Sequence, residues 1–286
     1  MMSMTPLPAH YAAEAASEAG IAAQETRLVP AVERAVRLLD ALAAARQPLS
    51  LAELARMLAL PKSSVHGLLA TLAALGLARR DADGEFSLGA KPLQWADVYS
   101  AQSDVLRAFD AQVDHPALRT ETTMLAVLDG ADVMYLACRQ GSRPLAVNFR
   151  VGGRFPACRT STGKAIMATL PPARVRELIG DGALPRLTRR GVATPAALLQ
   201  QLDEFRELGH AIDDEETAEG MQCFGAPIFG TRSEQAIAAV AVSVIKAGLT
   251  ARRRQELVTA IRELADAISR SLGADRPQAP PASRVV

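Results

Sequence analysis

The sequence of 286 residues contains few of the side chains that hold metal ions or form disulfide frameworks. Its three cysteines, Cys138, Cys158 and Cys223, lie far apart with no C-x-x-C pair, and there are only four histidines. This spacing matches neither a zinc site nor a disulfide network. We therefore predict no metal site and no bound cofactor, and the isolated cysteines favour a reducing cytoplasm.

Long apolar runs are also missing, since no segment reaches the roughly 18–20 uncharged residues that a membrane helix needs. Residues 1–27 are rich in alanine, but Glu14, Glu18 and Glu25 interrupt them and they have no basic start. They therefore do not resemble a signal peptide. We predict a flexible N-terminal extension over 1–27, a flexible tail over 274–286 and no membrane partner.

A strong charge of one sign is absent as well. The formal net charge is +1, and residues 28–91 carry eight Lys or Arg against six Asp or Glu, which leaves +2. Charge alone therefore does not indicate nucleic acid as a partner. What the chain does have is 49% hydrophobic and 22% charged residues, an ordinary globular composition that is sufficient for two domains.

The N-terminal part predicts three short helices and a hairpin. One helix follows Pro30, and a capping box of Ser50 and Glu53 opens the second. The sequence LARRDADGEFSL then places two short extended runs around the turn Asp81–Gly84. The expected buried face of the first helix is Val32, Ala35, Leu38, Leu39 and Leu42. This order of elements predicts a winged helix-turn-helix domain over residues 28–91.

The third of these helices has an apolar stripe and an opposite face of small residues. The stripe consists of Val65, Leu68, Leu69, Leu72 and Leu75. Ser63 or Ser64 is the expected N-cap, and Gly76 is the expected left-handed stop. The opposite face consists of Ser63, Gly67, Ala70 and Ala74, flanked by His66 and Thr71. Because Gly67 in mid-helix costs roughly 1 kcal/mol relative to Ala, this small face indicates the close approach of another molecule.

In a helix-turn-helix the second helix of the motif enters the major groove of DNA. Its N-terminal turn here presents a lysine and two serines to phosphates, and a histidine and a threonine further along reach base edges. Two arginines on the first wing strand are predicted to contact the phosphate backbone. The predicted DNA-binding residues are Lys62, Ser63, Ser64, His66, Gly67, Thr71, Arg79 and Arg80. The alternative is a small helical bundle that packs on another protein, with Gly67 as a helix–helix contact.

Beyond this domain the pattern changes. Residues 92–115 predict one linker helix that contains Trp95. From 116 to 273 strand-like runs alternate with helices, and short gaps such as Asp129–Asp132 favour antiparallel pairing in an α+β domain. The predicted strands are Thr123–Leu128, Val133–Cys138, Leu145–Phe149, His210–Asp213, Cys223–Phe229 and Ile237–Ile245. The predicted helices are Lys164–Leu170, Ala173–Ile179, Thr194–Leu208 and Thr250–Leu272.

The segment ACRTSTGKAI in this domain is similar to the end of a phosphate-binding loop. Cys158 stands where that motif needs Gly, and Ala165 stands where it needs Ser or Thr. We therefore predict no nucleotide site there. A polar turn that leads into a helix N-terminus remains, and it suits a carboxylate.

The segment AIDDEETAEGMQC carries four adjacent acids. Asp213, at the end of a strand, is expected to point inward, whereas Asp214–Glu216 are expected to form a solvated turn. Cys223 is interpreted as core filler, because His210 is the nearest base in sequence and no motif connects the two. No catalytic residue is predicted. For Ser243 a back-bonded core serine and a ligand contact both remain open.

The stretch PLSLAELARMLALPKSSVHGLLATLAALGLARRD resembles the DNA-binding domain of the IclR family of bacterial transcription regulators. The resemblance continues through VGGRFPACRTSTGKA, AIDDEETAEGMQCFGAPIF and AIAAVAVSVI in the order of the family, and it covers about Leu28 to Leu272. Family members carry a basic residue where this chain has Gly67. This departure shifts base recognition to Lys62, His66, Thr71 and DNA shape.

The resemblance also implies that the C-terminal domain is GAF-like and binds a small carboxylic acid as its effector. The effector-binding residues that it implies are Ser161, Thr162, Gly163, Asp213, Cys223, Ser243 and Ile245. Ile245 stands where the family has a second serine, which suggests a more apolar or aromatic ligand. An acidic Asp213 beside an anion indicates a ligand that also presents hydroxyl groups. Arg143 and Arg159 are either partners of the carboxylate or surface arginines.

These features together predict an effector-responsive regulator that represses, rather than activates, a catabolic operon. A palindromic operator in double-stranded DNA requires at least a dimer, and the resemblance implies a homodimer or a dimer of dimers. The first helix and the linker helix, including Trp95, are expected to form the dimer seam. The alternatives are an enzyme or binding protein for the same small molecule and a protein–protein adaptor.

Overall fold

The computed structural model describes residues 28–45, 47–143 and 149–274 of the chain. The predicted N-terminal extension and, apart from residue 274, the predicted tail lie outside these ranges. The chain divides into two compact units, with the boundary between Val98 and Tyr99. None of the described helices is both long and apolar enough to cross a membrane.

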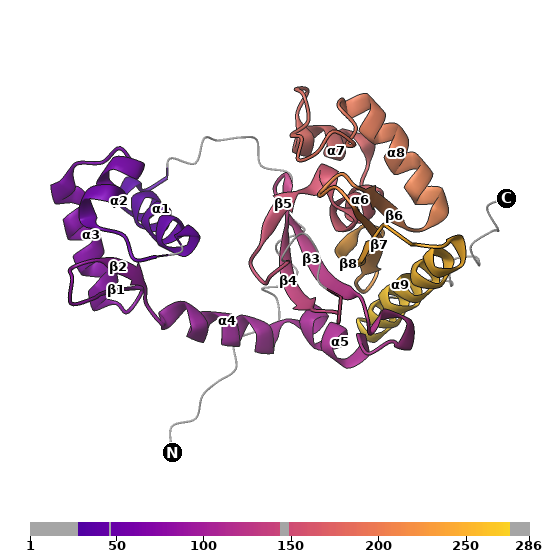
Figure 1. Ribbon diagram of the computed structural model, residues 1–286, viewed down its shortest axis with the longest axis horizontal. Coiled ribbons are helices and arrows are strands. Elements are labelled where there is room, and N and C mark those ends of the chain that lie inside the picture. Colours follow the sequence, from indigo (N-terminus) through magenta and orange to yellow (C-terminus); the bar gives the residue numbers. More distant parts are fainter. Residues whose placement is uncertain (1–27, 46, 144–148, 275–286) are drawn as a thin grey trace, which may run out of the picture. The chain divides into compact units, whose positions relative to one another are not determined.

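The N-terminal unit is a winged helix-turn-helix, as predicted (Figure 1). Its elements are α1 (Pro30–Ala44), α2 (Leu51–Met57), α3 (Lys62–Ala74), β1 (Ala78–Arg80) and β2 (Phe86–Leu88). The three helices bury Leu38, Leu54 and Leu69 in one core. Two residues of the predicted stripes are not in it, because Val32 is 61% exposed and Leu75 is 52% exposed. Both lie near a helix end, where the fold covers less of the surface.

The starts and ends of these helices follow local chemistry. The capping box is confirmed, because the Ser50 hydroxyl accepts from the Glu53 N–H and the Glu53 carboxylate accepts from the Ser50 N–H. Gly76 is confirmed as the left-handed stop, with φ of +77°. The predicted serine cap of α3 is wrong. The N-cap is Pro61, whose extended backbone precedes the first helical residue, so both serines lie inside the first turn.

The predicted single linker helix over 92–115 is also wrong. The structure has two helices, α4 (Lys91–Gln102) and α5 (Asp104–Gln112). Ser103 interrupts them with an extended backbone, and its hydroxyl accepts from the Leu106 N–H to cap α5. α4 buries no residue, whereas α5 buries Leu106 and Phe109 in the core of the C-terminal unit. α5 is therefore part of that unit.

The C-terminal unit is built on one antiparallel sheet of six strands in the order β5-β4-β3-β8-β7-β6. The strands are β3 (Thr122–Asp129), β4 (Asp132–Arg139), β5 (Arg154–Pro156), β6 (Ala211–Asp214), β7 (Met221–Phe229) and β8 (Ala236–Ile245). Five match predicted strands, and β5 was not predicted. The predicted strand Leu145–Phe149 lies outside the described residues except for Phe149, which belongs to no strand.

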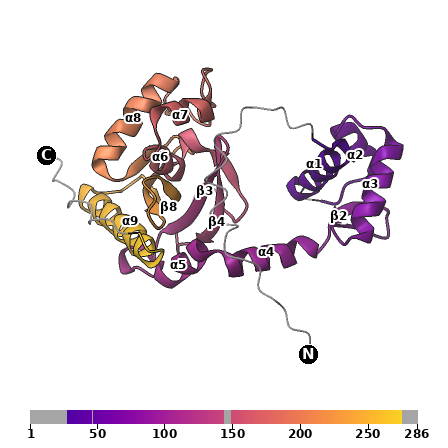
Figure 2. The same ribbon diagram turned by 180° about the vertical axis from the view of Figure 1, so that it is seen from behind.

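Helices cover both faces of this sheet (Figures 1 and 2). On one face lie α6 (Ser161–Met167), α7 (Pro172–Ile179) and α8 (Pro195–Leu208), and on the other lie α5 and α9 (Ala251–Ser271). Short 3-10 turns, η3 (Pro116–Leu118) and η4 (Ala157–Arg159), precede β3 and α6. β8 faces both layers, because Ala239 and Ala241 pack in the α6 core while Val240 and Val242 pack in the α9 core. The α+β architecture of the prediction is confirmed.

Candidate functional site

The small face of α3 is exposed over its whole length. Ser63, His66, Gly67, Ala70, Thr71 and Ala74 are all exposed, while Val65, Leu69 and Leu72 are buried. A Cβ atom added at Gly67 would meet no atom of the described chain within 4 Å. The glycine is therefore not a contact with another helix of the described chain. The face is open to a partner that comes close to the helix backbone.

The hydroxyl of Thr71 already donates a hydrogen bond within α3. Its Oγ1 lies 3.0 Å from the carbonyl oxygen of Gly67, one turn earlier, and donates to it. The oxygen keeps its lone pairs, so toward a base Thr71 can act as an acceptor. An acceptor at that point suits the amino group of adenine or cytosine in the major groove.

The two arginines of the wing lie differently. Consecutive residues of a strand point to opposite faces, so Arg79 and Arg80 are separated. Arg80 is turned back onto the hairpin, where its Nε donates to the Gly84 carbonyl at 3.3 Å and its guanidinium lies 5.6 Å from the ring centre of Phe86. Arg79 is exposed and faces away from that hairpin contact.

The predicted effector residues of the sheet form one row. The register places Asp213 opposite Cys223, Cys223 opposite Ser243, and Ser243 opposite Thr122. The row therefore crosses β6, β7, β8 and β3 on the face that carries α6, and all four residues are buried. The Cys223 Sγ and the Ser243 Oγ are 3.0 Å apart, within hydrogen-bond distance. Thr122 is a member of the row that the sequence did not indicate.

The N-terminus of α6 lies directly above this row. A Cβ at Gly225 of β7 would be 2.5 Å from the Ser161 carbonyl oxygen, so glycine is needed for the helix to approach the strand. Thr160 caps the helix by accepting from the Gly163 N–H at 3.0 Å. The buried Tyr135 side chain reaches Thr162 from β4. The structure thus brings Ser161, Thr162 and Gly163 together with the row.

Ile245 lies at the rim of this arrangement. It is two residues beyond Ser243 on β8, on the same face by strand alternation, and it pairs with Met221. At 40% exposure it is more open than the serine. An apolar residue therefore replaces a polar one where the row meets the surface.

The carboxyl group of Asp213 supports the turn that follows it. One oxygen accepts from the Glu216 N–H at 2.8 Å and from the Thr217 N–H at 3.1 Å. Burial raises the pKa of Asp213, while hydrogen bonds from Thr217 and the charge of Lys164 act in the opposite direction. Asp213 points inward, as predicted.

Asp214 and Glu215 are partly exposed and pair with Lys246, but Glu216 does not lie in a solvated turn as predicted, because it is buried. Its carboxylate forms an ion pair with Lys164 and lies 3.5 Å from Arg159, and both of these cations are fully buried. Burial raises the pKa of Glu216, and Lys164 opposes this. The surface alternative for Arg159 is thus excluded, whereas Arg143 is exposed and lies 3.6 Å from Glu121. The Gly-Lys pair and the acidic run were visible in the sequence, but nothing local indicated that they meet.

Arg159 connects α6 to the segment before α8. Its Nε donates to the Pro185 carbonyl at 2.5 Å and its Nη2 donates to the Val192 carbonyl at 2.6 Å. The Thr217 hydroxyl donates to the Arg159 carbonyl at 3.1 Å. The buried charges therefore join three loops around the row.

The chemistry of a hydrolase is not assembled around Cys223. Burial raises the pKa of its thiol, so the thiolate is disfavoured. The ring of His210 is oriented by the Leu208 carbonyl, 3.2 Å from Nδ1, and burial lowers its pKa. Among the described residues no cluster of His, Cys, Asp or Glu could hold a metal ion.

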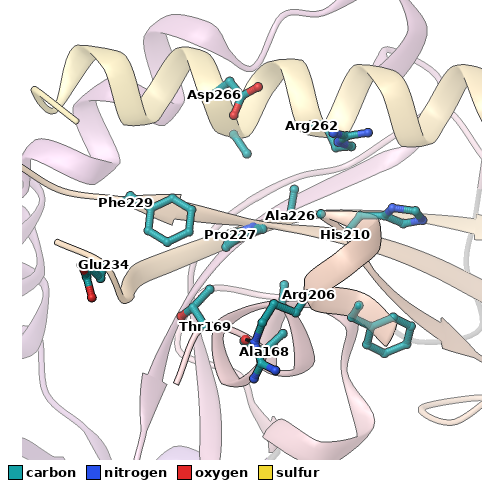
Figure 3. Close-up of a pocket in the computed structure, with 14 residues that line it drawn as sticks. Ala168, Thr169, Arg206, His210, Ala226, Pro227, Phe229, Glu234, Arg262 and Asp266 are labelled. Carbon is teal, nitrogen blue, oxygen red and sulfur yellow. Dashed lines mark hydrogen bonds between the residues drawn. The ribbon is translucent and has the colours of Figure 1, made fainter. Parts of the chain in front are cut away.

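The C-terminal unit also has a cavity of about 370 Å³ that the sequence did not indicate (Figure 3). It lies between α6, α8, β7 and α9. None of the residues that line it belongs to the predicted effector set. This space is thus separate from the row of Asp213, Cys223 and Ser243.

Comparisons with known proteins cover both units. A family model described as the IclR helix-turn-helix domain matches residues 31–82, and one described as bacterial transcriptional regulator IclR C-terminal matches residues 98–270. The glycerol operon regulatory protein of Streptomyces griseus is 35% identical over an alignment of 260 residues that covers 87% of this chain and 99% of that protein.

Solved structures are similar over the same length. The Agobacterium tumefaciens repressor BlcR is 38% identical with a TM-score of 0.56, covering 87% of this chain and 99% of that one. The Thermotoga maritima IclR structure is 25% identical with a TM-score of 0.69, covering 85% of this chain and 99% of that one.

Proposed function

The chain belongs to the IclR family of bacterial transcriptional regulators, and we propose that it is a repressor whose hold on a palindromic operator is controlled by a small organic acid. It binds DNA through the winged helix-turn-helix, and it is a regulator rather than an enzyme. The observation that carries the proposal is the exposed small face of α3, which fits a partner that approaches the helix closely.

The DNA contacts that we propose come from two elements. Lys62, Ser63 and Ser64 in the first turn of α3 contact phosphates, while His66 and Thr71 reach base edges. Gly67 allows the backbone of α3 to come close to the groove. On the wing, Arg79 contacts phosphate, and Arg80 acts mainly by holding the hairpin through Gly84 and Phe86.

The effector site that we propose is the row beneath α6. Its contacts are the backbone and side chains of Ser161, Thr162 and Gly163 from above and Asp213, Cys223 and Ser243 from below, with Ile245 at the rim. Two fully buried cations nearby, Arg159 and Lys164, share one ion-pair partner, Glu216, and so still favour an anionic ligand. The hydroxyl and thiol groups of the row favour a ligand with its own hydroxyl or carbonyl groups. A small hydroxylated or aromatic carboxylic acid meets both conditions.

Repression, an operon as target and a dimeric state are supported by relatives and by the surface. One relative is named a repressor and another an operon regulatory protein. α4 exposes Leu93, Val98 and Tyr99 together with Trp95, which is 53% exposed. Such an unburied apolar face is expected of a helix that pairs with a second copy. Access to the chromosome would place the protein in the cytoplasm.

Two measurements test the proposal on the full chain. Fragments from the upstream region of its own gene should shift in a gel at low salt, and unrelated fragments of equal length should not compete. Calorimetry with a panel of hydroxylated and aromatic carboxylic acids should find one that binds and that changes the DNA affinity. The absence of any shifted fragment would remove the repressor proposal, and the absence of any bound acid would remove the effector proposal.

A further inference from the structure

The cavity at the edge of the sheet is formed because β6 is short. β6 pairs with β7 only as far as Gly225, so from Ala226 onward the described part of the chain places no strand beside this edge. α6, α8 and α9 enclose the edge and leave the space of about 370 Å³ (Figure 3). Small-molecule sites commonly occupy about 300–1,000 Å³, so the cavity has the size of a ligand site.

The edge itself does not accept an added strand. Pro227 has no N–H, and the N–H of Phe229 donates to the Ser269 hydroxyl at 3.0 Å. An incoming peptide strand would thus find no free donor at these two positions. The cavity is suited instead to a molecule that contacts side chains.

Part of the cavity lining is apolar. Ala165 from α6, Ala226 from β7 and Ala265 from α9 all line it, and each contributes only a methyl group. Phe205 from α8 adds an aromatic ring. Three small residues from three elements leave room for an apolar group of modest size and surround it with carbon atoms.

The charges of the cavity are separated along α9. Arg262 and Asp266 are four residues apart, so they stand about 6 Å from each other along the helix. Arg262 lies at the end with His210, and a Cβ at Gly209 would be 3.4 Å from its guanidinium. Asp266 lies toward the end with Glu234 (Figure 3). Along α9 one end is therefore cationic and the other is acidic, while a further lining cation, Arg206 of α8, pairs with Asp203 and donates to the Ala168 carbonyl.

The pKa shifts of Asp266 and His210 are consistent with an acidic end and a cationic end of the cavity. Burial raises the pKa of Asp266, against the charges of Arg270 and Arg262, so an ammonium group beside it would stabilise the ionised carboxylate. Burial lowers the pKa of His210, so the positive charge at the other end comes from Arg262. A ligand with both charges meets a partner at each end.

We propose that this cavity binds an α-amino acid with an apolar side chain. Its ammonium group pairs with Asp266, its carboxylate pairs with Arg262, and its side chain lies among the three alanines and the ring of Phe205. The two charged groups of an α-amino acid are attached to the same carbon, which matches a pair of partners one helical turn apart. The site is separate from the proposed organic-acid site and does not depend on it.

Calorimetry on the full chain tests the charge requirement directly. The probes are L-valine, L-leucine, L-isoleucine and L-methionine, with 4-methylpentanoate as leucine without its ammonium group and 3-methylbutylamine as leucine without its carboxylate. At least one amino acid should bind, and each truncated probe should bind about tenfold more weakly than leucine or worse. Binding of none of the four amino acids, or equal binding of 4-methylpentanoate, would overturn the proposal.

Matched variants locate the bound molecule. Asp266→Asn should weaken leucine binding about tenfold and leave 4-methylpentanoate unchanged, because only the ammonium partner is lost. Glu256→Gln changes an acid near the start of α9 that lies ten residues before Asp266 and does not line the cavity, and it should have no effect. Ser243→Ala, in the other site, should also leave leucine binding unchanged. Loss of binding in Ser243→Ala but not in Asp266→Asn would place the amino acid elsewhere and overturn the proposal.

Discussion

The guanidinium of Arg159 lies against Gly191, so closely that a Cβ there would be 2.2 Å from Nη1. This contact lets the buried arginine reach the carbonyls of Pro185 and Val192 on either side of the glycine's segment. Gly191→Ala should therefore lower the free energy of unfolding by about 1–3 kcal/mol through overpacking. Gly182→Ala is the control, because a Cβ there meets no atom within 4 Å. Urea unfolding of the two variants should separate them, and equal stability would contradict the role of Gly191.

Gly67→Ala should have opposite effects on stability and on DNA binding. In the free protein the new methyl group meets nothing within 4 Å, so the helix gains about 1 kcal/mol. In the complex the methyl group occupies the space that we assign to DNA, so affinity for the selected operator should fall. Thermal unfolding and gel shifts on one preparation measure both. A variant that is more stable and binds equally well would show that DNA does not approach this part of α3.

Arg79→Ala should mainly lower the affinity for DNA, whereas Arg80→Ala should mainly lower the stability of the N-terminal unit. Arg79→Ala removes an exposed phosphate contact, so it should weaken binding to all DNA sequences alike. It should also make the slope of log K against log salt concentration less steep by about one. Arg80→Ala instead removes the contacts with Gly84 and Phe86 and should mainly lower the stability of the N-terminal unit. Titrations at several salt concentrations distinguish them. If Arg79→Ala weakened binding to the operator but not to other DNA sequences, the assignment of Arg79 to a phosphate contact would be wrong.

Asp213→Asn should change how stability depends on pH. The raised pKa of Asp213 means that the native state holds more protons than the unfolded chain between the ordinary value of 3.8 and the raised value. The free energy of unfolding therefore falls as the pH rises through that window. The amide keeps an oxygen for the Glu216 and Thr217 N–H groups but does not titrate. Urea unfolding from about pH 4 to about pH 7 should show a smaller fall for the variant, and an equal or larger fall would contradict the shift.

Elements with strong local signals were predictable from the sequence. The capping box of Ser50 and Glu53 set the start of α2, and the predicted helix Thr194–Leu208 matches α8, which Thr194 caps and Gly209 ends. The row of Asp213, Cys223 and Ser243 was reached only through the family resemblance, because strand register is a long-range property.

Other features had no local signal. Lys164 and Glu216 are 52 residues apart in the sequence, so no periodicity indicates their ion pair. Ser103 separates α4 from α5 within a stretch whose apolar pattern continues on both sides, and only packing decides that α5 joins the C-terminal core. β5 has three residues, too few to show an alternating pattern.

The strand β8 separates the shape of the space beneath α6 from the packing of the core against α9. Ala239 and Ala241 face the α6 layer and Val240 and Val242 face α9, so a substitution at Ala241 alters the room beneath α6 while Val242 keeps the opposite layer in place. Sensors for different metabolites could therefore arise on this frame by changing every second residue of one strand, with the interior on the far side left intact.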